Sequence, residues 1–280
     1  MGPDPVALSA LLVRAVNVAP SNARQFFEQE FAPFAVNANG FFTGFYEPEV
    51  AGSLTQTAEF RVPLHRPPAD FPEARDRAAV MAGALDGLGL ELVWLCDPVD
   101  AFFIHVQGAA RIRLSDGGMM RVTYAAKSGH AYTAIGRVLI DKGALTRETA
   151  DMAGIRAWLA AHPAEMPAIL AANRSYIYFR EAPVDDVALG PIAAAKVPLT
   201  ANRSLAVDKA IHPFHTPVWV ETTEPSGGAF RHLLVAQDTG SAIVGPARGD
   251  IFFGSGDAAG AIAGAMRAPG RFVVLLPRAR

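Results

Sequence analysis

The feature that most constrains this fold is the pattern of short apolar stretches, separated by glycine and proline, that follows Pro183. These stretches predict strands at 204–207, 217–222, 230–236, 241–244, 250–253 and 271–276. A single helical pattern, at 257–267, interrupts them. Short strands at close spacing with one helix predict a compact β-barrel and not a parallel sheet built from βαβ units.

The preceding part of the chain mixes helical and strand patterns. Helical spacing of apolar residues is found at 6–35 (with a break at Pro20), at 75–88, at 131–143 and at 147–172. Strand patterns are found at 40–48, at 92–124 (with a hairpin turn at 115–118) and at 176–179. The predicted fold class is therefore mainly β, of the α+β type, with a few helices.

Composition excludes several kinds of function. With 25 basic and 27 acidic residues the formal net charge is −2, which does not favour binding to nucleic acid. The sequence contains no apolar stretch of about 18 residues, which is the length that would predict a transmembrane helix. The single cysteine, Cys96, and the seven scattered histidines form no spacing typical of a metal site. No nucleotide-binding or nucleophile motif is present, so we expect neither a metal nor an organic cofactor.

Three aspartates stand at the ends of predicted strands in the C-terminal part. Asp208 follows one apolar stretch, Asp238 follows another, and Asp250 begins a third. At such positions partial burial and a neighbouring carboxylate can raise a pKa, as an acid catalyst requires. Aspartates also end strands simply to accept backbone N–H bonds in turns. From the residues alone both interpretations stay open.

Several motifs, in order along the chain, resemble the membrane-bound lytic murein transglycosylase A family. They are Phe-Thr-Gly-Phe-Tyr-Glu-Pro (42–48), Phe-Phe-Ile-His-Val-Gln-Gly (102–108), Tyr-Ala-Ala-Lys-Ser-Gly-His-Ala-Tyr (124–132) and Val-Pro-Leu-Thr-Ala-Asn-Arg-Ser-Leu-Ala-Val-Asp (197–208). Two later stretches, Val-Ala-Gln-Asp-Thr-Gly-Ser-Ala-Ile (235–243) and Gly-Asp-Ile-Phe-Phe-Gly (249–254), look like that family's "3D" domain.

The resemblance implies two domains. Residues 1–50 and 186–280 would form a double-psi β-barrel, with the 3D domain in its C-terminal part. Residues 51–185 would form an inserted, smaller β-barrel domain that binds substrate. A peptidoglycan glycan strand is expected in the groove between them. Family members cleave the β-1,4 bond between N-acetylmuramic acid and N-acetylglucosamine and leave a 1,6-anhydro-muramoyl end.

The resemblance also implies the site residues. The catalytic acid/base falls on Asp250, and Asp238 and Asp208 match the two supporting aspartates. Nine further positions match motif residues that face the groove: Thr43, Tyr46, Gln107, Gly108, Lys127, Gly129, Tyr132, Ser204 and Gly240. One carboxyl can serve both steps, first as the acid and then as the base. We expect Asp250 to hold the proton, and backbone donors to keep Asp238 ionised.

The chain departs from the family pattern at three places. The lysine of Asp-Thr-Gly-Gly-Ala-Ile-Lys-Gly is replaced by Val244, and Arg248 is a candidate to supply the missing positive charge. A Gln-Gly-Ser-Gly element reads Gln107-Gly-Ala109-Ala110, and a Pro-Leu-Gly turn reads Pro213-Phe214-His215. These changes affect contacts in the groove more than the catalytic aspartate.

The sequence leaves two alternative functions open and implies a location in the cell. A non-catalytic glycan-binding protein on the same scaffold would lack the acid, and a hydrolytic glycosidase would need a second carboxylate to activate water. Family members are normally outer-membrane lipoproteins that face the periplasm. The absence of a lipid-modified cysteine near Met1 predicts that a leader was removed or that the protein is a soluble periplasmic form.

Overall fold

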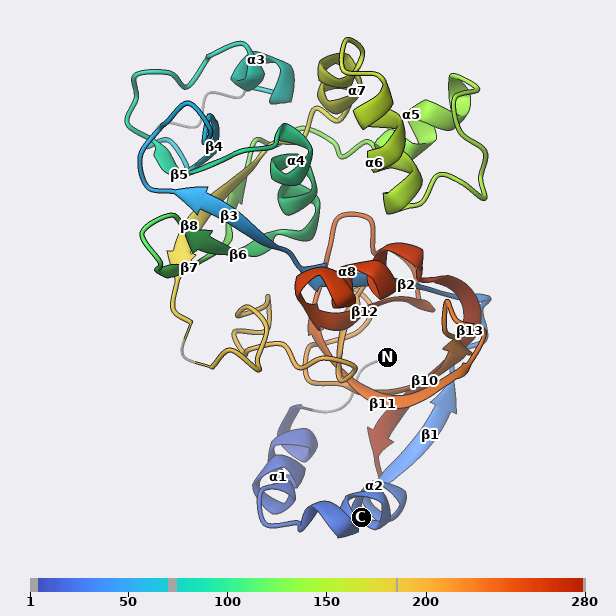
Figure 1. Cartoon of the computed structure of the whole chain (residues 1–280). Coiled ribbons are helices and arrows are strands. Elements are labelled where there is room, and N and C mark those ends of the chain that lie inside the picture. The colour runs from blue at the N-terminus through green and yellow to red at the C-terminus, as the bar shows by residue number, and fades with distance from the viewer. Residues whose placement is uncertain (1–4, 70–74, 185, 279–280) are drawn as a thin grey trace. The chain divides into compact units, whose positions relative to one another are not determined.

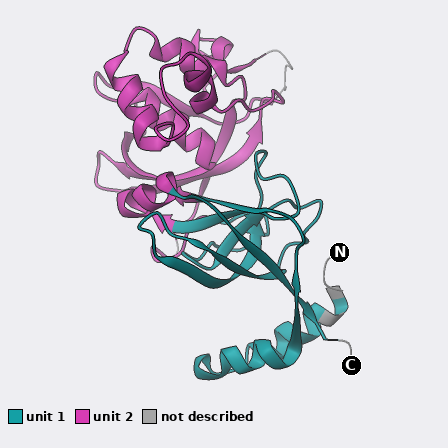
Figure 2. Ribbon diagram, turned by 90° about the vertical axis from the view of Figure 1, so that its right-hand side faces the viewer, with its two compact units in different colours: residues 1–44, 192–253, 266–280 teal, residues 45–191, 254–265 magenta. Residues whose placement is uncertain are grey.

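The structure, a computed structural model, describes residues 5–69, 75–184 and 186–278. Its contacts divide the chain into two compact units (Figure 2). Unit 1 comprises Met1–Gly44, Ile192–Phe253 and Met266–Arg280, and unit 2 comprises Phe45–Pro191 and Gly254–Ala265. The domain boundaries expected from the resemblance stay a prediction.

Unit 1 contains a barrel. In the described part of the chain its strands follow the order β1-β13-β10-β11-β9-β12-β2, and β2 pairs again with β13, which closes the ring from β13 to β2 (Figure 1). The strands are β1 (Phe31–Ala35), β2 (Gly40–Glu47), β9 (Ser204–Val207), β10 (Pro217–Thr223), β11 (Ala229–Asp238), β12 (Arg248–Ser255) and β13 (Arg267–Pro277). The predicted mainly-β class is confirmed.

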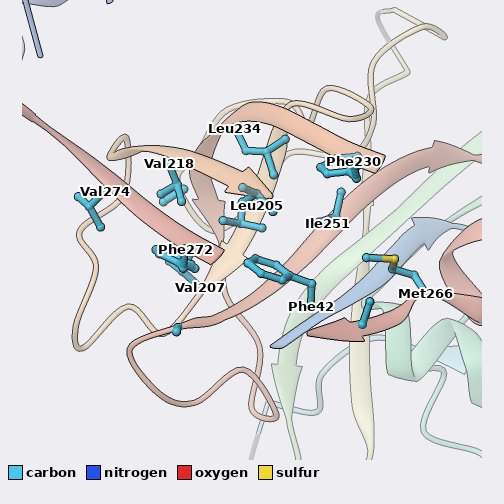
Figure 3. Close-up of a cluster of buried hydrophobic side chains, with 14 residues drawn as sticks. Phe42, Leu205, Val207, Val218, Phe230, Leu234, Ile251, Met266, Phe272 and Val274 are labelled. Carbon is cyan, nitrogen blue, oxygen red and sulfur yellow. The ribbon is translucent and has the colours of Figure 1, made fainter. Parts of the chain in front are cut away.

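Alternating apolar residues of these strands fill the barrel (Figure 3). Its buried side chains include Phe42, Leu205, Phe230, Ile251 and Phe272. The ring closes where β2 meets β13 at its narrowest approach, with Gly40 opposite Gly270. A Cβ atom on Gly40 would lie 2.2 Å from the carbonyl oxygen of Gly270, so this seam requires glycine.

The N-terminal segment is only partly helical. It forms α1 (Pro5–Ala15), a 3₁₀ turn (Pro20–Asn22) and α2 (Ala23–Glu30), but then continues as strand β1. The helix predicted over 6–35 is therefore wrong for its last residues. Phe31 is buried against Leu8 and Leu11 of α1, and β1 pairs with β13, so pairing to the barrel outweighs the local helical spacing.

Unit 2 contains a second sheet, in the order β4-β5-β3-β6-β7-β8 among the described residues. Its strands are β3 (Glu49–Ser53), β4 (Val62–His65), β5 (Glu91–Leu95), β6 (Ala109–Leu114), β7 (Met119–Lys127) and β8 (Ile177–Ala182). The sheet curls, since its outermost strands β4 and β8 contact each other. Near this contact, His65 Nδ1 and the Tyr176 hydroxyl share a hydrogen bond of 2.7 Å.

Helices pack on this sheet and on one another. They are α3 (Arg77–Met81), α4 (Pro98–Gln107), α5 (Ile135–Asp141), α6 (Met152–Ala161), α7 (Met166–Ala172) and α8 (Gly256–Ala265). Apolar side chains of α4, α5, α6 and α7 form one core, which includes Phe102, Leu139, Leu159 and Ile169. No helix in the described ranges is long and apolar enough to cross a membrane.

Helix α4 corrects the strand pattern predicted over 92–124. The side chain of Asp97 accepts a hydrogen bond from the backbone N–H of Val99 (2.8 Å), and Pro98 occupies the first helical turn. Gly108 ends the helix in the left-handed conformation with φ of 79°. These start and stop signals outweigh the alternating pattern of the segment.

A buried carboxylate, Glu47, organises unit 2. Its side chain is fully buried, and its two oxygens face Arg121 Nε (2.6 Å) and Arg111 Nε (2.9 Å). The Ser255 hydroxyl donates a further hydrogen bond of 2.7 Å. Both arginines also donate to the carbonyl oxygen of Leu189, at 2.9 and 3.0 Å. The network thus binds together strands β6 and β7, the chain before β3, and the segments leading into and out of unit 2.

We predict that Glu47→Gln lowers the free energy of unfolding by about 3–5 kcal/mol, because it leaves two guanidinium groups buried without their counter-charge. Urea denaturation followed by circular dichroism measures the change. Glu49→Gln is the matched control: Glu49 pairs with the exposed Arg113 at 3.5 Å, and we expect it to cost less than about 1 kcal/mol. Equal costs for the two variants would contradict the central role of Glu47.

Candidate active site

Two of the three predicted aspartates lie on either side of one residue of the barrel. Strand β9 lies between β11 and β12, and Ala206 pairs with Asp238 of β11 and with Asp250 of β12. Residues paired directly across strands point to the same face of a sheet. The two carboxylates therefore share a face, with Cα atoms roughly 10 Å apart across two strand spacings.

Asp250 is held by a threonine from the neighbouring strand β2. The hydroxyl of Thr43 donates a hydrogen bond to Asp250 Oδ1. Arg248, two residues before Asp250, donates from its guanidinium to the same hydroxyl at 2.7 Å. Its guanidinium also lies over the ring of Phe41, 5.4 Å from the centroid. Thr43 and Arg248 thus fix one carboxyl oxygen of Asp250, while Oδ2 has no hydrogen-bond partner among the described residues.

The environment raises the pKa of both carboxyls. Burial raises the pKa of Asp238 to about 6, and the negative charge of Asp250 adds to this rise. Backbone N–H groups of Thr239 and Ala194 act in the opposite direction, as the sequence led us to expect, but burial outweighs them. Burial also raises the pKa of Asp250, against the hydrogen bond from Thr43 and the positive charge of Arg248.

Asp208 has a different environment from the other two aspartates. Just after β9, it accepts backbone N–H bonds from Gly245 (2.9 Å) and Ala210 (3.0 Å), which lower its pKa. It therefore stays ionised and anchors the loop between β11 and β12. The Thr239 hydroxyl ties the start of that loop to the carbonyl oxygen of Val207 at 2.9 Å.

This anchored loop overturns the strand predicted at 241–244, which forms turns and irregular structure. Of its apolar residues, Ile243 is buried and Val244 is exposed. Gly240, a predicted groove residue, lies exposed in the same loop. Ser204 is buried at the start of β9, where its hydroxyl accepts from the Thr200 N–H (2.8 Å) and donates to the side chain of Gln237, next to Asp238.

The other predicted groove residues belong to unit 2. The backbone N–H of Tyr46 donates to Gln107 Oε1 at 3.2 Å, so these two positions are joined. Lys127 is exposed at the end of β7 and Gly129 is exposed just beyond it. Tyr132 is partly exposed in the same loop. Gly108 follows Gln107 as the cap of α4. The groove expected between the two domains stays a prediction.

Two further residues of this region were not predicted as functional. Glu47 belongs to the Phe-Thr-Gly-Phe-Tyr-Glu-Pro motif, yet only its burial shows that it anchors the segment carrying Thr43 and Tyr46. Arg156 of α6 is more distant in sequence, and the cluster it forms with Asp100 and Tyr46 carries no sequence signal that we can identify. Among the described residues, no group of three or more His, Cys, Asp or Glu side chains is placed to bind a metal ion.

Two carboxyls with raised pKa values thus share one face of the barrel strands, an arrangement typical of proteins that perform acid–base chemistry. Comparison with known proteins identifies the family. The family model described as "MltA specific insert domain" matches residues 41–180, and the model described as "3D domain" matches residues 203–276. The chain belongs to the MltA family.

Individual relatives agree with this classification. The chain is 36% identical to membrane-bound lytic murein transglycosylase A of Escherichia coli (strain K12) over 245 residues, which cover 84% of this chain and 65% of that protein. A membrane-bound lytic murein transglycosylase from Agrobacterium tumefaciens has a similar crystal structure, with a TM-score of 0.89 and 45% identity, covering 98% of this chain and 84% of that one.

A third similar structure is that of E. coli MltA with bound chitohexaose. Its TM-score is 0.85 at 31% identity, covering 96% of this chain and 85% of that one. The relative therefore binds an oligosaccharide. The present chain spans slightly less than two thirds of the length of the curated E. coli relative.

We predict that the Asp238 carboxyl titrates near pH 6 and the Asp208 carboxyl below the ordinary aspartate range. Carboxyl ¹³C chemical shifts followed by NMR across pH 2–8 measure both midpoints in one sample, with Asp208 as the internal control. Coincident midpoints for the two groups would contradict the difference in their environments.

The same shift sets how Asp238 affects stability. The folded state holds this proton more tightly than the unfolded chain, whose aspartates titrate near pH 4. Its stabilising contribution is therefore complete below about pH 4 and is lost as the pH rises to about 6. In Asp238→Asn we expect this loss of stability between about pH 4 and pH 6 to be absent.

Proposed function

We propose that this protein is a lytic transglycosylase that cleaves the β-1,4 bond between N-acetylmuramic acid and N-acetylglucosamine in peptidoglycan. The observation that carries the proposal is Asp250, whose pKa burial raises and whose Oδ1 is held by Thr43. A raised pKa favours the protonated form of the carboxyl, which is the form that donates to a glycosidic oxygen. Relatives named as lytic murein transglycosylases support the choice of substrate.

In the first step, Asp250 donates its proton to the oxygen of the leaving N-acetylglucosamine as the bond from this oxygen to the anomeric carbon breaks. Because Thr43 already donates to Oδ1, the transferable proton belongs on Oδ2. The sugar becomes oxocarbenium-like as its bond to the leaving group lengthens.

In the second step, the Asp250 carboxylate takes the proton of the muramoyl 6-hydroxyl, whose oxygen then bonds to the anomeric carbon. The product is a 1,6-anhydro-muramoyl end, and Asp250 returns to its protonated state. No water molecule enters the reaction. An internal hydroxyl gains from being held close to the carbon it attacks.

The neighbouring groups tune this cycle. Arg248, through Thr43, stabilises the carboxylate that forms after the first step, since its positive charge favours the ionised state of Asp250. Burial raises the pKa of Asp250 and so favours its protonated state before the first step. Asp208 acts indirectly, because it anchors the loop that follows Asp238.

Glycan binding involves both sets of predicted groove residues. On the barrel we propose Thr43, Ser204 and Gly240. In unit 2 we propose Tyr46, Gln107, Gly108, Lys127, Gly129 and Tyr132. The chitohexaose bound by the E. coli relative supports an extended glycan as the ligand. The names of the curated relatives include "membrane-bound", which supports a place in the cell envelope, and we propose the periplasm, with outer-membrane association in a full-length form.

Two other functions are less well supported. A glycan-binding protein without catalysis would have no need of an aspartate with a raised pKa held by Thr43 and Arg248. An inverting hydrolase needs a second carboxylate placed to activate water. Asp238, which shares the face of Asp250, is the candidate for that role. The names of the relatives favour transglycosylation over hydrolysis.

We predict that incubation with purified sacculi releases muropeptides with anhydro ends, because the 6-hydroxyl replaces water as the nucleophile. Mass spectrometry distinguishes the two chemistries, since the anhydro product is one water lighter than the hydrolysis product. Chelation with EDTA should leave the yield unchanged. Products with reducing ends would identify a hydrolase, and intact sacculi would identify a binding protein.

We predict that Asp250→Asn lowers the cleavage rate at least about 100-fold while leaving glycan binding and folding nearly intact, because the amide keeps the shape of the carboxyl but cannot donate a proton in its place. Product release from sacculi measures the rate. Asp141→Asn is the matched control, since Asp141 pairs only with the exposed Arg137 of its own helix. A rate above about a tenth of wild type in Asp250→Asn would remove this residue from the role.

A further inference from the structure

A cavity of about 430 Å³ lies within unit 2 and is not part of the aspartate cluster on the barrel. Its walls come from Tyr46, from residues 48–51 and from single positions on α4 and β6, together with positions on α6 and α8. A cavity of this size accommodates a small molecule or a short branch of a larger one. Five charged side chains line it.

One wall of the cavity carries the positively charged side chain of Arg156, which is held by its neighbours. Its guanidinium pairs with Asp100 at 2.8 Å and lies over the ring of Phe103, 4.5 Å from the centroid. Its positive charge also opposes the rise in pKa that burial gives to the Tyr46 hydroxyl. An arginine has five N–H donors in a rigid fork, so these contacts orient the group and leave donors for a ligand.

The opposite side comes from helix α8. The ring of Tyr46 packs against this helix at Gly260, where a Cβ atom would lie 2.7 Å from a ring carbon. Glycine at this position therefore lets the tyrosine and the helix approach closely. Tyr46 also contacts Met152, with its hydroxyl 3.8 Å from the sulfur. The cavity is thus bounded by packed side chains of α6 and α8.

The charges in the cavity do not cancel. Arg156 is paired with Asp100, and Arg113 is paired with Glu49 at 3.5 Å. The remaining carboxylate, Asp257 in the first turn of α8, is exposed and has no ion pair within the described ranges. The cavity therefore presents an unpaired carboxylate together with an oriented guanidinium that has donors to spare. A ligand that carries an ammonium group and a carbonyl or carboxylate group matches both.

We propose that this cavity binds the peptide branch of a peptidoglycan strand, with the ammonium group of the branch at Asp257 and a carbonyl or carboxylate oxygen at Arg156. The proposal rests on the proposed function for the identity of the glycan. It adds a second recognition site, in unit 2, to the site that cleaves the strand. An enzyme with such a site distinguishes strands that carry peptides from bare strands.

Isothermal titration calorimetry with isolated peptides tests the proposal without requiring cleavage. The probe, called the free peptide, is N-acetyl-L-Ala-γ-D-Glu-L-Lys-D-Ala, whose N-terminal amide matches the attached branch. It is compared with the same peptide also acetylated on the lysine side chain. We expect the wild-type protein to bind the free peptide about fivefold more tightly than the acetylated one, the range of an exposed ion pair.

Asp257→Asn should weaken binding of the free peptide by the same factor and leave that of the acetylated peptide unchanged. Asp141→Asn, the same substitution at an exposed site outside the cavity, should bind both peptides as the wild type does. Circular dichroism confirms that each variant is folded.

Two results would overturn the proposal: no binding of the free peptide at millimolar concentration, or equal binding of the free and acetylated peptides by the wild type. The outcome is independent of the proposed activity. If sacculi remain uncleaved while peptide affinity depends on Asp257, the proposed function fails and the peptide site stands. If anhydro products form and the peptides do not bind, the proposed function stands and the peptide site fails.

Discussion

The buried ion pairs of Glu47 are the interaction on which the rest of the structure depends. A carboxylate without solvent access is costly unless its charge and both its oxygens are satisfied. Here Arg111 and Arg121 supply the charge and Ser255 adds a hydroxyl. Because the two arginines also bind the carbonyl oxygen of Leu189, the cluster holds the chain near three of the points at which it passes between the two units. The strand that contains Thr43 and Tyr46 is therefore held in place at its end by Glu47.

The chemistry of the barrel follows from strand order. Strands β11 and β12 are consecutive in the sequence, yet β9 pairs with both and separates them. This insertion places Asp238 and Asp250 on either side of Ala206, close enough for the charge of one to raise the pKa of the other. Thr43 and Arg248 then favour the ionised state of Asp250, so its pKa is a balance between burial and these two groups. A carboxyl in such a balance can give up a proton and take one back, as a two-step reaction needs.

The two proposals assign different kinds of recognition to the two units. On the barrel, Asp250 with Thr43 and Arg248 is proposed to act on the sugar at the bond that breaks. The cavity of unit 2 presents paired arginines and a free carboxylate at Asp257, which suits a charged branch. On these proposals, the barrel would recognise the sugars of a glycan strand and the cavity of unit 2 would recognise its peptide. Cleavage would depend on the barrel site alone.

The sequence by itself determined most of the strands of the barrel, the helix between β12 and β13, and the three aspartates near strand ends, because these depend on short-range alternation and on turn residues. The ordered motifs were enough to predict the family. Tertiary structure decided the rest. Residues 241–244 became a loop through the anchor at Asp208. Residues 98–107 are an exception, because their helix has local start and stop signals at Asp97 and Gly108 that the alternating apolar pattern masks. Which aspartates share a face, and that Glu47 is buried, depend on pairings between residues far apart in the chain. No local pattern encodes such pairings, since their energy arises only when the segments have met.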